Sequence, residues 1–267
     1  MALIRIDDPD DPRIAGFRDI RERDLTGRQG LFVAEGEVVL NVLTSPQSLC
    51  RPVALLLDRK RAEGLAEVIA RVPDEVPVYV ADQPILDAIA GFHLHRGILA
   101  LGGKPEPVTL AAQLAAPGSE AVVVAACGIG NHDNMGGLFR NAAAFGAGAV
   151  LLDAHCCDPF YRKAIRVSVG AVLRTPMVTG LDSMAMVEGL KAAGFEVLAL
   201  TPGANEPLEQ TPRGGRVAVL LGPEGPGLSP AVIERCRPVG IPMSGGFDSL
   251  NVSVASGIAL HHFTRRP

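Results

Sequence analysis

The strongest constraint on the fold is a run of six apolar residues without polar alternation, Ala-Val-Val-Val-Ala-Ala at residues 121–126. A strand with one solvated face alternates apolar and polar residues, whereas a strand buried on both faces of a parallel sheet is continuously apolar. Further strands are predicted at residues 149–152, 196–201, 216–221 and 239–241. Helical patterns separate them near residues 135–145, 160–172, 183–193 and 250–263. This βα alternation predicts an α/β domain with a mostly parallel sheet and helices on both faces.

The first hundred or so residues predict a separate, smaller α/β domain. We expect strands at residues 53–58, 76–80 and 97–101, and helices at residues 61–71 and 82–90. Glycine and proline then interrupt the pattern at residues 102–107 and again at 117–118. The sequence therefore divides into a first domain at residues 1–102, a linker at 103–118 and a second domain at 119–267.

Composition predicts a globular protein outside the membrane. Hydrophobic residues make up 48% and charged residues 20% of the chain, which is enough apolar material for a core. No apolar run approaches the roughly 18 residues that a membrane helix needs. The start of the chain becomes acidic at residues 7–8, which is unlike a secretory signal. We expect a cytoplasmic protein without a membrane partner.

The five cysteines favour structural thiols over a metal site. Cys156 and Cys157 are adjacent and follow His155, an arrangement that invites a zinc interpretation. Zinc sites in proteins commonly use paired C-x-x-C ligands, and the sequence contains no such pair. The odd, scattered set also differs from a disulfide framework. We therefore predict no metal.

The net charge of −4 excludes a surface that is basic throughout, although a local basic patch is enough to bind phosphates. Five arginines lie close together near the N-terminus with three acidic residues among them: Arg13, Arg18, Arg21, Arg23 and Arg28, with Asp19, Glu22 and Asp24. The pattern fits a solvated mixed-charge surface and an RNA-contact segment equally well.

Three loops of the second domain carry residues suited to chemistry. In the first, residues 131–140, Asn134 is placed to cap the following helix, and Arg140 lies among small apolar residues of that helix. A guanidinium is always charged and needs water, an acid or a phosphate, so Arg140 is either an ordinary surface residue or a functional one.

The second loop, residues 222–229, follows a strand and has the sequence Gly-Pro-Glu-Gly-Pro-Gly-Leu-Ser. Its glycines allow a tight turn or a close approach to a ligand, and Glu224 favours a hydroxyl, an amine or an arginine over phosphate. The third loop, residues 241–253, places Ser249 and Asn251 at the start of the last helix. These two side chains can cap that helix or bind a nucleoside or carboxylate ligand.

A dinucleotide-binding site is the rival interpretation. Gly128-Ile129-Gly130 follows a strand, and Asp153 ends the next strand, as in the nicotinamide-binding fingerprint. Asp133 stands where the third glycine belongs, however, and a carboxylate beside a pyrophosphate is unfavourable. The rival also leaves the second and third loops without a role.

In their order and spacing the three loops resemble the signature motifs of the SpoU/TrmH family of RNA ribose methyltransferases. The first resembles Asn-x-Gly-x-x-x-Arg, the second Gly-x-Glu-Gly-x-Gly-Leu, and the third Ile-Pro-Met-x-Gly followed by Ser-Leu-Asn-Val-Ser-x-Ala. The matching positions are Asn134, Gly136, Arg140, Gly222, Glu224, Gly225, Gly227, Leu228, Ile241, Pro242, Met243, Gly245, Ser249, Leu250, Asn251, Val252, Ser253 and Ala255. Two positions depart from the family: Asp248 replaces a usual Glu, and Gly137 a commoner Ala.

The resemblance implies a deep trefoil knot in the second domain (the SPOUT fold), a first domain similar to ribosomal protein L30e that binds the RNA substrate, and a homodimer whose active site lies at the interface. It implies S-adenosylmethionine as the cofactor, held by Leu200, Thr201, Gly222, Ile241, Met243 and Leu250. The catalytic group it implies comprises Arg140, Asn134, Glu224, Ser249 and Asn251, with Glu224 expected to pair with Arg140.

The activity implied by the resemblance is methylation of a ribose 2′-hydroxyl in tRNA or rRNA. Arg140 is expected to stabilise the developing alkoxide or to organise a phosphate that takes the proton, since a guanidinium is a poor base at neutral pH. An RNA-binding protein that keeps the cofactor pocket without turnover is the alternative from another class. The RNA class and the target nucleotide stay open.

Overall fold

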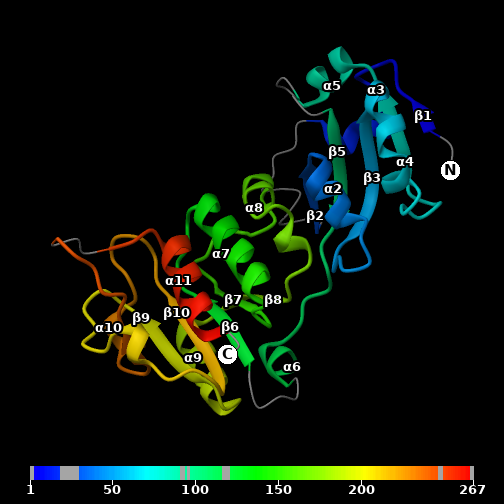
Figure 1. Ribbon diagram of the computed structural model, residues 1–267. Coiled ribbons are helices and arrows are strands. Elements are labelled where there is room, and N and C mark those ends of the chain that lie inside the picture. The colour runs from blue at the N-terminus through cyan, green and yellow to red at the C-terminus, as the bar shows by residue number, and fades with distance from the viewer. Residues whose placement is uncertain are drawn as a thin grey trace. The chain divides into compact units, whose positions relative to one another are not determined.

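The computed structural model describes residues 3–18, 30–90, 94, 97–115, 121–245 and 249–264 (Figure 1). Its contacts divide the chain into two units. Unit 1 comprises Met1–Pro105 and Asp158–Arg174, and unit 2 comprises Glu106–Cys157 and Thr175–Pro267. The segment Asp158–Arg174 therefore packs with unit 1, although it lies within the stretch that the sequence assigns to the second domain.

Unit 1 is built on a five-stranded mixed sheet in the order β1-β4-β3-β5-β2. β5 runs antiparallel to both of its neighbours, and the other pairs are parallel. The strands are β1 (Leu3–Arg5), β2 (Leu31–Glu35), β3 (Arg51–Asp58), β4 (Val78–Ala81) and β5 (Ile98–Gly103). The helices are η1 (Pro12–Phe17), α2 (Glu37–Leu43), α3 (Arg59–Ala62), η3 (Glu63–Leu65), α4 (Ala66–Ile69), α5 (Gln83–Ala90), α8 (Arg162–Val167) and η4 (Ala171–Leu173).

Two predictions for unit 1 were wrong in detail, and glycine explains both. The single helix expected at residues 61–71 is divided into α3, η3 and α4, with Gly64, a poor helix former, in the middle segment. Gly102 and Gly103 continue β5 instead of ending it. A Cβ at Gly102 would lie 2.2 Å from Cζ of Phe32, so the absent side chain lets the phenyl ring cover the strand.

Unit 2 is built on a six-stranded sheet, order β11-β9-β10-β6-β7-β8, in which every neighbouring pair is parallel. The strands are β6 (Ala121–Ala126), β7 (Val150–Asp153), β8 (Met177–Leu181), β9 (Glu196–Leu200), β10 (Arg216–Leu221) and β11 (Arg237–Val239). The helices are α6 (Leu110–Leu114), α7 (His132–Phe145), α9 (Ser183–Ala192), η5 (Leu208–Gln210), α10 (Pro230–Ile233) and α11 (Val252–Thr264). The predicted α/β class is confirmed.

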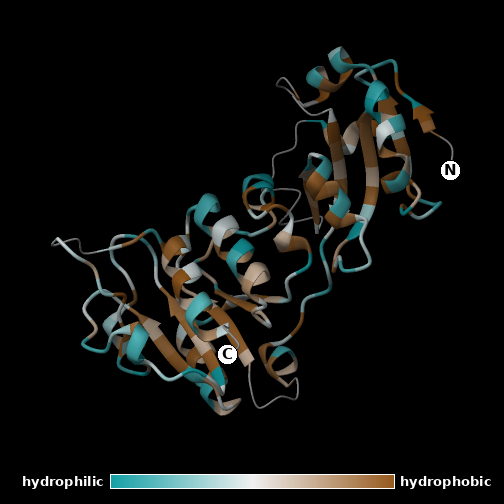
Figure 2. Ribbon diagram, viewed as in Figure 1, coloured by the Kyte–Doolittle hydropathy of each residue, from teal (hydrophilic) through white to brown (hydrophobic). Residues whose placement is uncertain are grey.

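The apolar strand β6 lies near the centre of this sheet between β10 and β7. Val124 and Ala125, whose side chains point to opposite faces, are both fully buried. Figure 2 shows the strands of the sheet as predominantly hydrophobic. Burial on both faces is what the continuous apolar run predicted.

None of the helices in the described ranges is long and apolar enough to cross a membrane.

Candidate active site

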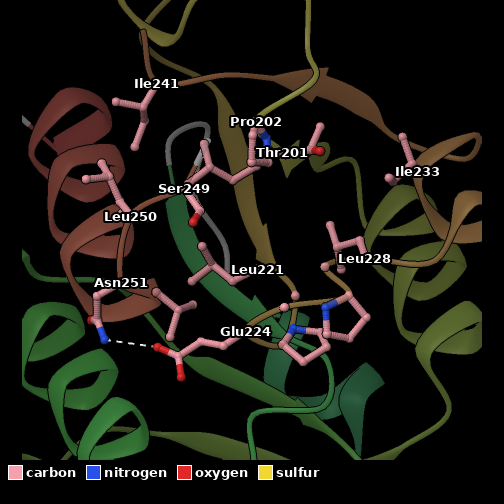
Figure 3. A pocket seen from close by; sticks show the side chains of 18 of the residues that line it. Thr201, Pro202, Leu221, Glu224, Leu228, Ile233, Ile241, Ser249, Leu250 and Asn251 are labelled. Atoms are coloured by element: carbon pink, nitrogen blue, oxygen red, sulfur yellow. Dashed lines mark hydrogen bonds between the residues drawn. The ribbon is translucent and has the colours of Figure 1, made fainter. Parts of the chain in front are cut away.

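A cavity of about 630 Å³ opens at the carboxyl edge of the parallel sheet in unit 2 (Figure 3). Its walls come from the ends of β9 and β10, from the segment after β11 and from the start of α11. Ligands of open α/β sheets bind beyond the carboxyl ends of the strands, and this volume suits one small organic molecule. All six residues that the sequence assigned to cofactor binding line the cavity: Leu200, Thr201, Gly222, Ile241, Met243 and Leu250.

The glycine loop after β10 forms one wall and requires its glycines. A Cβ at Gly222 would lie 2.5 Å from the backbone nitrogen of Leu228, so only glycine lets the chain return this closely. Gly225 and Gly227 adopt φ angles of 85° and 68°, which other residues rarely adopt. The loop is thus a tight turn, and it also lines the cavity.

Asn251 connects the three sequence motifs. Its side-chain oxygen accepts hydrogen bonds from the backbone nitrogens of Ser253 (2.9 Å) and Val254 (3.4 Å), which caps α11. Its side-chain nitrogen donates to Oδ1 of Asn134 (2.8 Å) and to Oε1 of Glu224 (3.1 Å). The oxygen of the Asn251 amide therefore caps α11, its nitrogen joins the three motifs, and ligand binding by Asn251 stays a prediction.

The sequence predicted Asn134 as the N-cap of α7, and this prediction was wrong. Asn131 caps this helix by accepting from the backbone nitrogens of Asp133 and Asn134. α7 consequently begins at His132, and Asn134 lies inside its first turn with only 5% of its surface exposed. From there its side chain accepts the hydrogen bond from Asn251.

Glu224 and Arg140 do not form the expected pair. Within the described part of the chain the Glu224 carboxylate accepts from Asn251, and no ion pair joins it to Arg140. Arg140 lies exposed in the middle of α7 and is not among the residues that line the cavity. Ser249 does line it, from the segment before α11. Asp248 lies outside the described residues.

Sequence reasoning missed a second junction between α7 and α11. Asn141 donates to the backbone oxygen of Ser253 (2.5 Å) and to Oγ of Ser256 (2.9 Å). One turn earlier on α7, a Cβ at Gly137 would lie 2.5 Å from Cβ of Ser253, so the two helices are in close contact. An amide among alanines, next to Arg140, was the available signal in the sequence.

Asp153, on which the dinucleotide-binding interpretation relied, has a structural role. Its carboxylate is 3% exposed and accepts from the Gly128 nitrogen (2.9 Å), the His155 nitrogen (3.0 Å) and the Ser183 hydroxyl (2.9 Å). Burial raises the pKa of this carboxyl, but the hydrogen bonds, with that from Gly128 the largest, bring its pKa below the ordinary value. A carboxylate used in this way has little capacity left for a ribose.

Several other residues singled out by sequence have local partners in the described part of the chain. Arg13 pairs with Asp11 and Arg18 with Asp10, whereas Arg21, Arg23 and Arg28 lie outside the described residues. Burial raises the pKa of the Cys156 thiol to about 12. His262 is buried, and its Nε2 lies 2.9 Å from the backbone oxygen of Thr211. The described residues contain no cluster of three or more potential metal ligands.

The parallel sheet, the cavity at its carboxyl edge and the glycine loop define an α/β protein with a small-molecule site joined to polar side chains of two neighbouring helices. Residues 121–261 match the SpoU rRNA Methylase family. The chain belongs to this family, and the resemblance noted from its motifs is confirmed.

Relatives cover nearly the whole chain. A tRNA/rRNA methyltransferase of Mycobacterium tuberculosis, described as uncharacterized, is 39% identical across 97% of this chain and 90% of its own. Among solved structures, an RNA 2′-O ribose methyltransferase is 26% identical with a TM-score of 0.73, covering 98% of this chain and 97% of that one. The AdoMet-bound rRNA methyltransferase of Sinorhizobium meliloti, 22% identical, covers 97% of both chains with a TM-score of 0.79 and therefore shares the fold.

Proposed function

We propose that the protein transfers a methyl group from S-adenosylmethionine to a ribose 2′-hydroxyl of RNA. The observation that carries this proposal is the joining of the cavity to Asn134 through Asn251, because it brings all three sequence motifs to one place. Family membership and the solved 2′-O ribose methyltransferase support the reaction.

The cavity fits the proposed cofactor in size and in chemistry. Leu200, Ile241 and Leu250 provide apolar walls for an adenine ring, and the glycine loop exposes backbone groups that can hydrogen-bond its edges. The S. meliloti structure is described as AdoMet-bound, which supports the assignment. When bound, this cofactor supplies an electrophilic methyl group and needs no metal.

The polar residues of the site position the ribose 2′-oxygen and stabilise the charge that develops on it. In this proposal Arg140 stabilises the charge that develops on the 2′-oxygen, since a guanidinium stays protonated at neutral pH and is an effective electrostatic partner. Asn251 fixes the glycine loop to α7 through Glu224 and Asn134, and Ser249 orients the cofactor or the ribose from the cavity wall. Holding donor and acceptor in line contributes much of the rate enhancement.

A homodimer that completes the site is part of this proposal. Leu250, two residues before α11, and Val254 and Ile258 on α11 are spaced by four residues, and they are 40%, 50% and 39% exposed. This spacing gives one apolar stripe on a helix that packs against α7, the helix that carries Arg140. In this proposal a second copy covers the stripe and supplies Arg140 from its α7 to the cavity. Val254→Arg should convert the dimer to a monomer in light scattering and abolish turnover.

The proposal includes a knot, an RNA-binding first domain and a cytoplasmic location. Support for the knot comes from the C-terminal segment, which contacts the loop after β9 at two places. Leu208 donates to the Gly240 oxygen (2.7 Å), and His262 contacts Thr211. The mixed sheet of unit 1, with helices packed on it, is compatible with an L30e-like domain that binds tRNA or rRNA.

Transfer of labelled methyl to bulk tRNA and, separately, to unmodified rRNA tests the function. Wild-type protein should label one RNA class at a position resistant to alkaline cleavage, and Arg140→Ala should lose the label while still binding the cofactor. Arg140→Lys keeps the charge and should retain part of the activity if the role is electrostatic. Cofactor and RNA binding without label in either class would favour an RNA-binding protein that no longer transfers methyl.

A further inference from the structure

The segment Asp158–Arg174, here called the excursion segment, leaves unit 2 after Cys157, packs with unit 1 and returns at Thr175. The Phe160 ring lies 5.3 Å from the Phe32 ring, centroid to centroid, and Lys104 of unit 1 pairs with Asp158 at 2.7 Å. The Leu49 nitrogen donates to the Leu173 oxygen at 2.8 Å. Figure 1 draws α8 beside β2, against which it packs. The segment is therefore firmly anchored to unit 1.

The excursion segment is basic in an acidic chain. It contains four cations and a single acid, whereas the whole chain has a net charge of −4. The acid, Asp158, is paired with Lys104, and Arg162 lies 3.8 Å from Glu35. Lys163 and Arg166 are exposed three residues apart on α8, so they lie on one side of the helix. Arg174 is exposed where the chain re-enters unit 2. Three exposed cations within one short segment suit a polyanion.

The end of α8 carries a strained residue that sequence analysis did not single out. Val169 has a φ of 56° and is the one non-glycine residue with positive φ among those described. It donates to the Arg166 oxygen, and Gly170 donates to the Ile165 oxygen, which together form a Schellman cap. This position ordinarily takes glycine, because a β-branched side chain is disfavoured there. The valine side chain is nevertheless 37% exposed.

We propose that the exposed side of the excursion segment is an RNA-binding surface in which Lys163, Arg166 and Arg174 contact backbone phosphates and Val169 packs against a base or ribose. A residue that is unfavourable at its backbone conformation and still keeps 37% of its surface exposed is explained if that surface meets a ligand. The surface lies on unit 1, and the backbone joins it at both ends to β7 and β8 of the catalytic unit. This inference rests on the proposed function, because it takes the ligand to be the RNA substrate.

Binding of the full-length protein to unmodified tRNA and rRNA at several salt concentrations tests the cations. Each lost phosphate contact should reduce the slope of log K against log salt by about one. Lys163→Gln/Arg166→Gln should therefore reduce the slope by about one to two and raise the KM for RNA about tenfold or more. The KM for S-adenosylmethionine and the kcat at saturating RNA should stay within about twofold of wild type. The matched control, Lys191→Gln/Arg213→Gln, removes two exposed cations of unit 2 and should bind RNA as wild type does.

Val169→Gly and Val169→Asn test the apolar contact, because both residues tolerate positive φ. Each variant should melt at or above the wild-type temperature yet bind RNA several-fold more weakly. A role confined to folding would change the melting temperature and leave RNA affinity intact, which would overturn this part of the proposal.

Binding and turnover separate this inference from the proposed function. Loss of salt-sensitive RNA binding in the double variant, without methyl transfer by wild type, would support the surface and refute the activity. Methyl transfer by the double variant with an unchanged salt slope and KM would refute the surface and keep the activity. If the wild-type protein binds neither tRNA nor rRNA, the proposal of an RNA-binding surface is refuted as well.

Discussion

Asn251→Ala should destabilise unit 2 by an amount that can be worked out from the contacts of this residue. Loss of the cap on α11 costs about 0.5–2 kcal/mol. The side-chain oxygen of Asn134, a residue that is 5% exposed, loses the partner that lies 2.8 Å away, which costs about 1–3 kcal/mol. The exposed Glu224 adds little. We expect a total of about 2–4 kcal/mol and, at about 2–4 °C per kcal/mol for chains of this size, a fall in Tm of several degrees.

Asn251→Ser divides this total into its two parts. Serine caps helices about as well as asparagine but is too short to reach Asn134 and Glu224. It should recover the capping contribution, so its unfolding free energy should lie between those of wild type and Asn251→Ala, while methyl transfer is lost in both variants.

Urea denaturation followed by circular dichroism measures these differences, with Glu224→Gln as the control for the exposed partner. That control should change the free energy of unfolding by less than about 1 kcal/mol. If Asn251→Ala costs less than about 0.5 kcal/mol, or if serine is as destabilising as alanine, the double role assigned to this amide is refuted.

Four further outcomes are expected. Gly222→Ala should abolish S-adenosylmethionine binding in calorimetry, because its Cβ would lie 2.5 Å from the Leu228 nitrogen. Asn141→Ala should lower kcat by a larger factor than it changes the KM for either substrate, because the lost bonds to Ser253 and Ser256 position α11. Asn141→Ser should restore part of the lost kcat. The pKa of Asp153 is lowered in the folded protein. Its contribution to stability is therefore present above the unfolded-state pKa and is lost as pH falls through the folded-state pKa. In Asp153→Asn, the decline in the free energy of unfolding by urea below about pH 4 should be less steep. Burial raises the pKa of Cys127 to about 11, so iodoacetamide at pH 8 should label it more than about tenfold slower in folded than in unfolded protein, read by mass spectrometry; equal rates would contradict that burial.

Local sequence features predicted much of the second unit. β6 and β10 occupy the predicted residues, and α9 differs from its prediction by one residue at its end. These elements follow from hydrophobic periodicity and from turn residues, which act over a few positions. Weaker signals failed: β1, β2 and β8 were not predicted, and β11 lies about two residues before its predicted position. Short strands gain their stability from sheet neighbours that are distant in sequence.

The sequence by itself determined the α/β class, the family and the residues that line the cavity, because motifs and apolar runs are written in consecutive positions. Tertiary structure alone decided the partners of those residues. It joined Asn134 to Asn251, joined Glu224 to Asn251 and not to Arg140, and brought Asn141 to α11. It also packed the excursion segment with unit 1. The physical reason is that a hydrogen bond or a packed contact between residues far apart in the sequence depends on the whole fold, which periodicity in one stretch of chain does not encode.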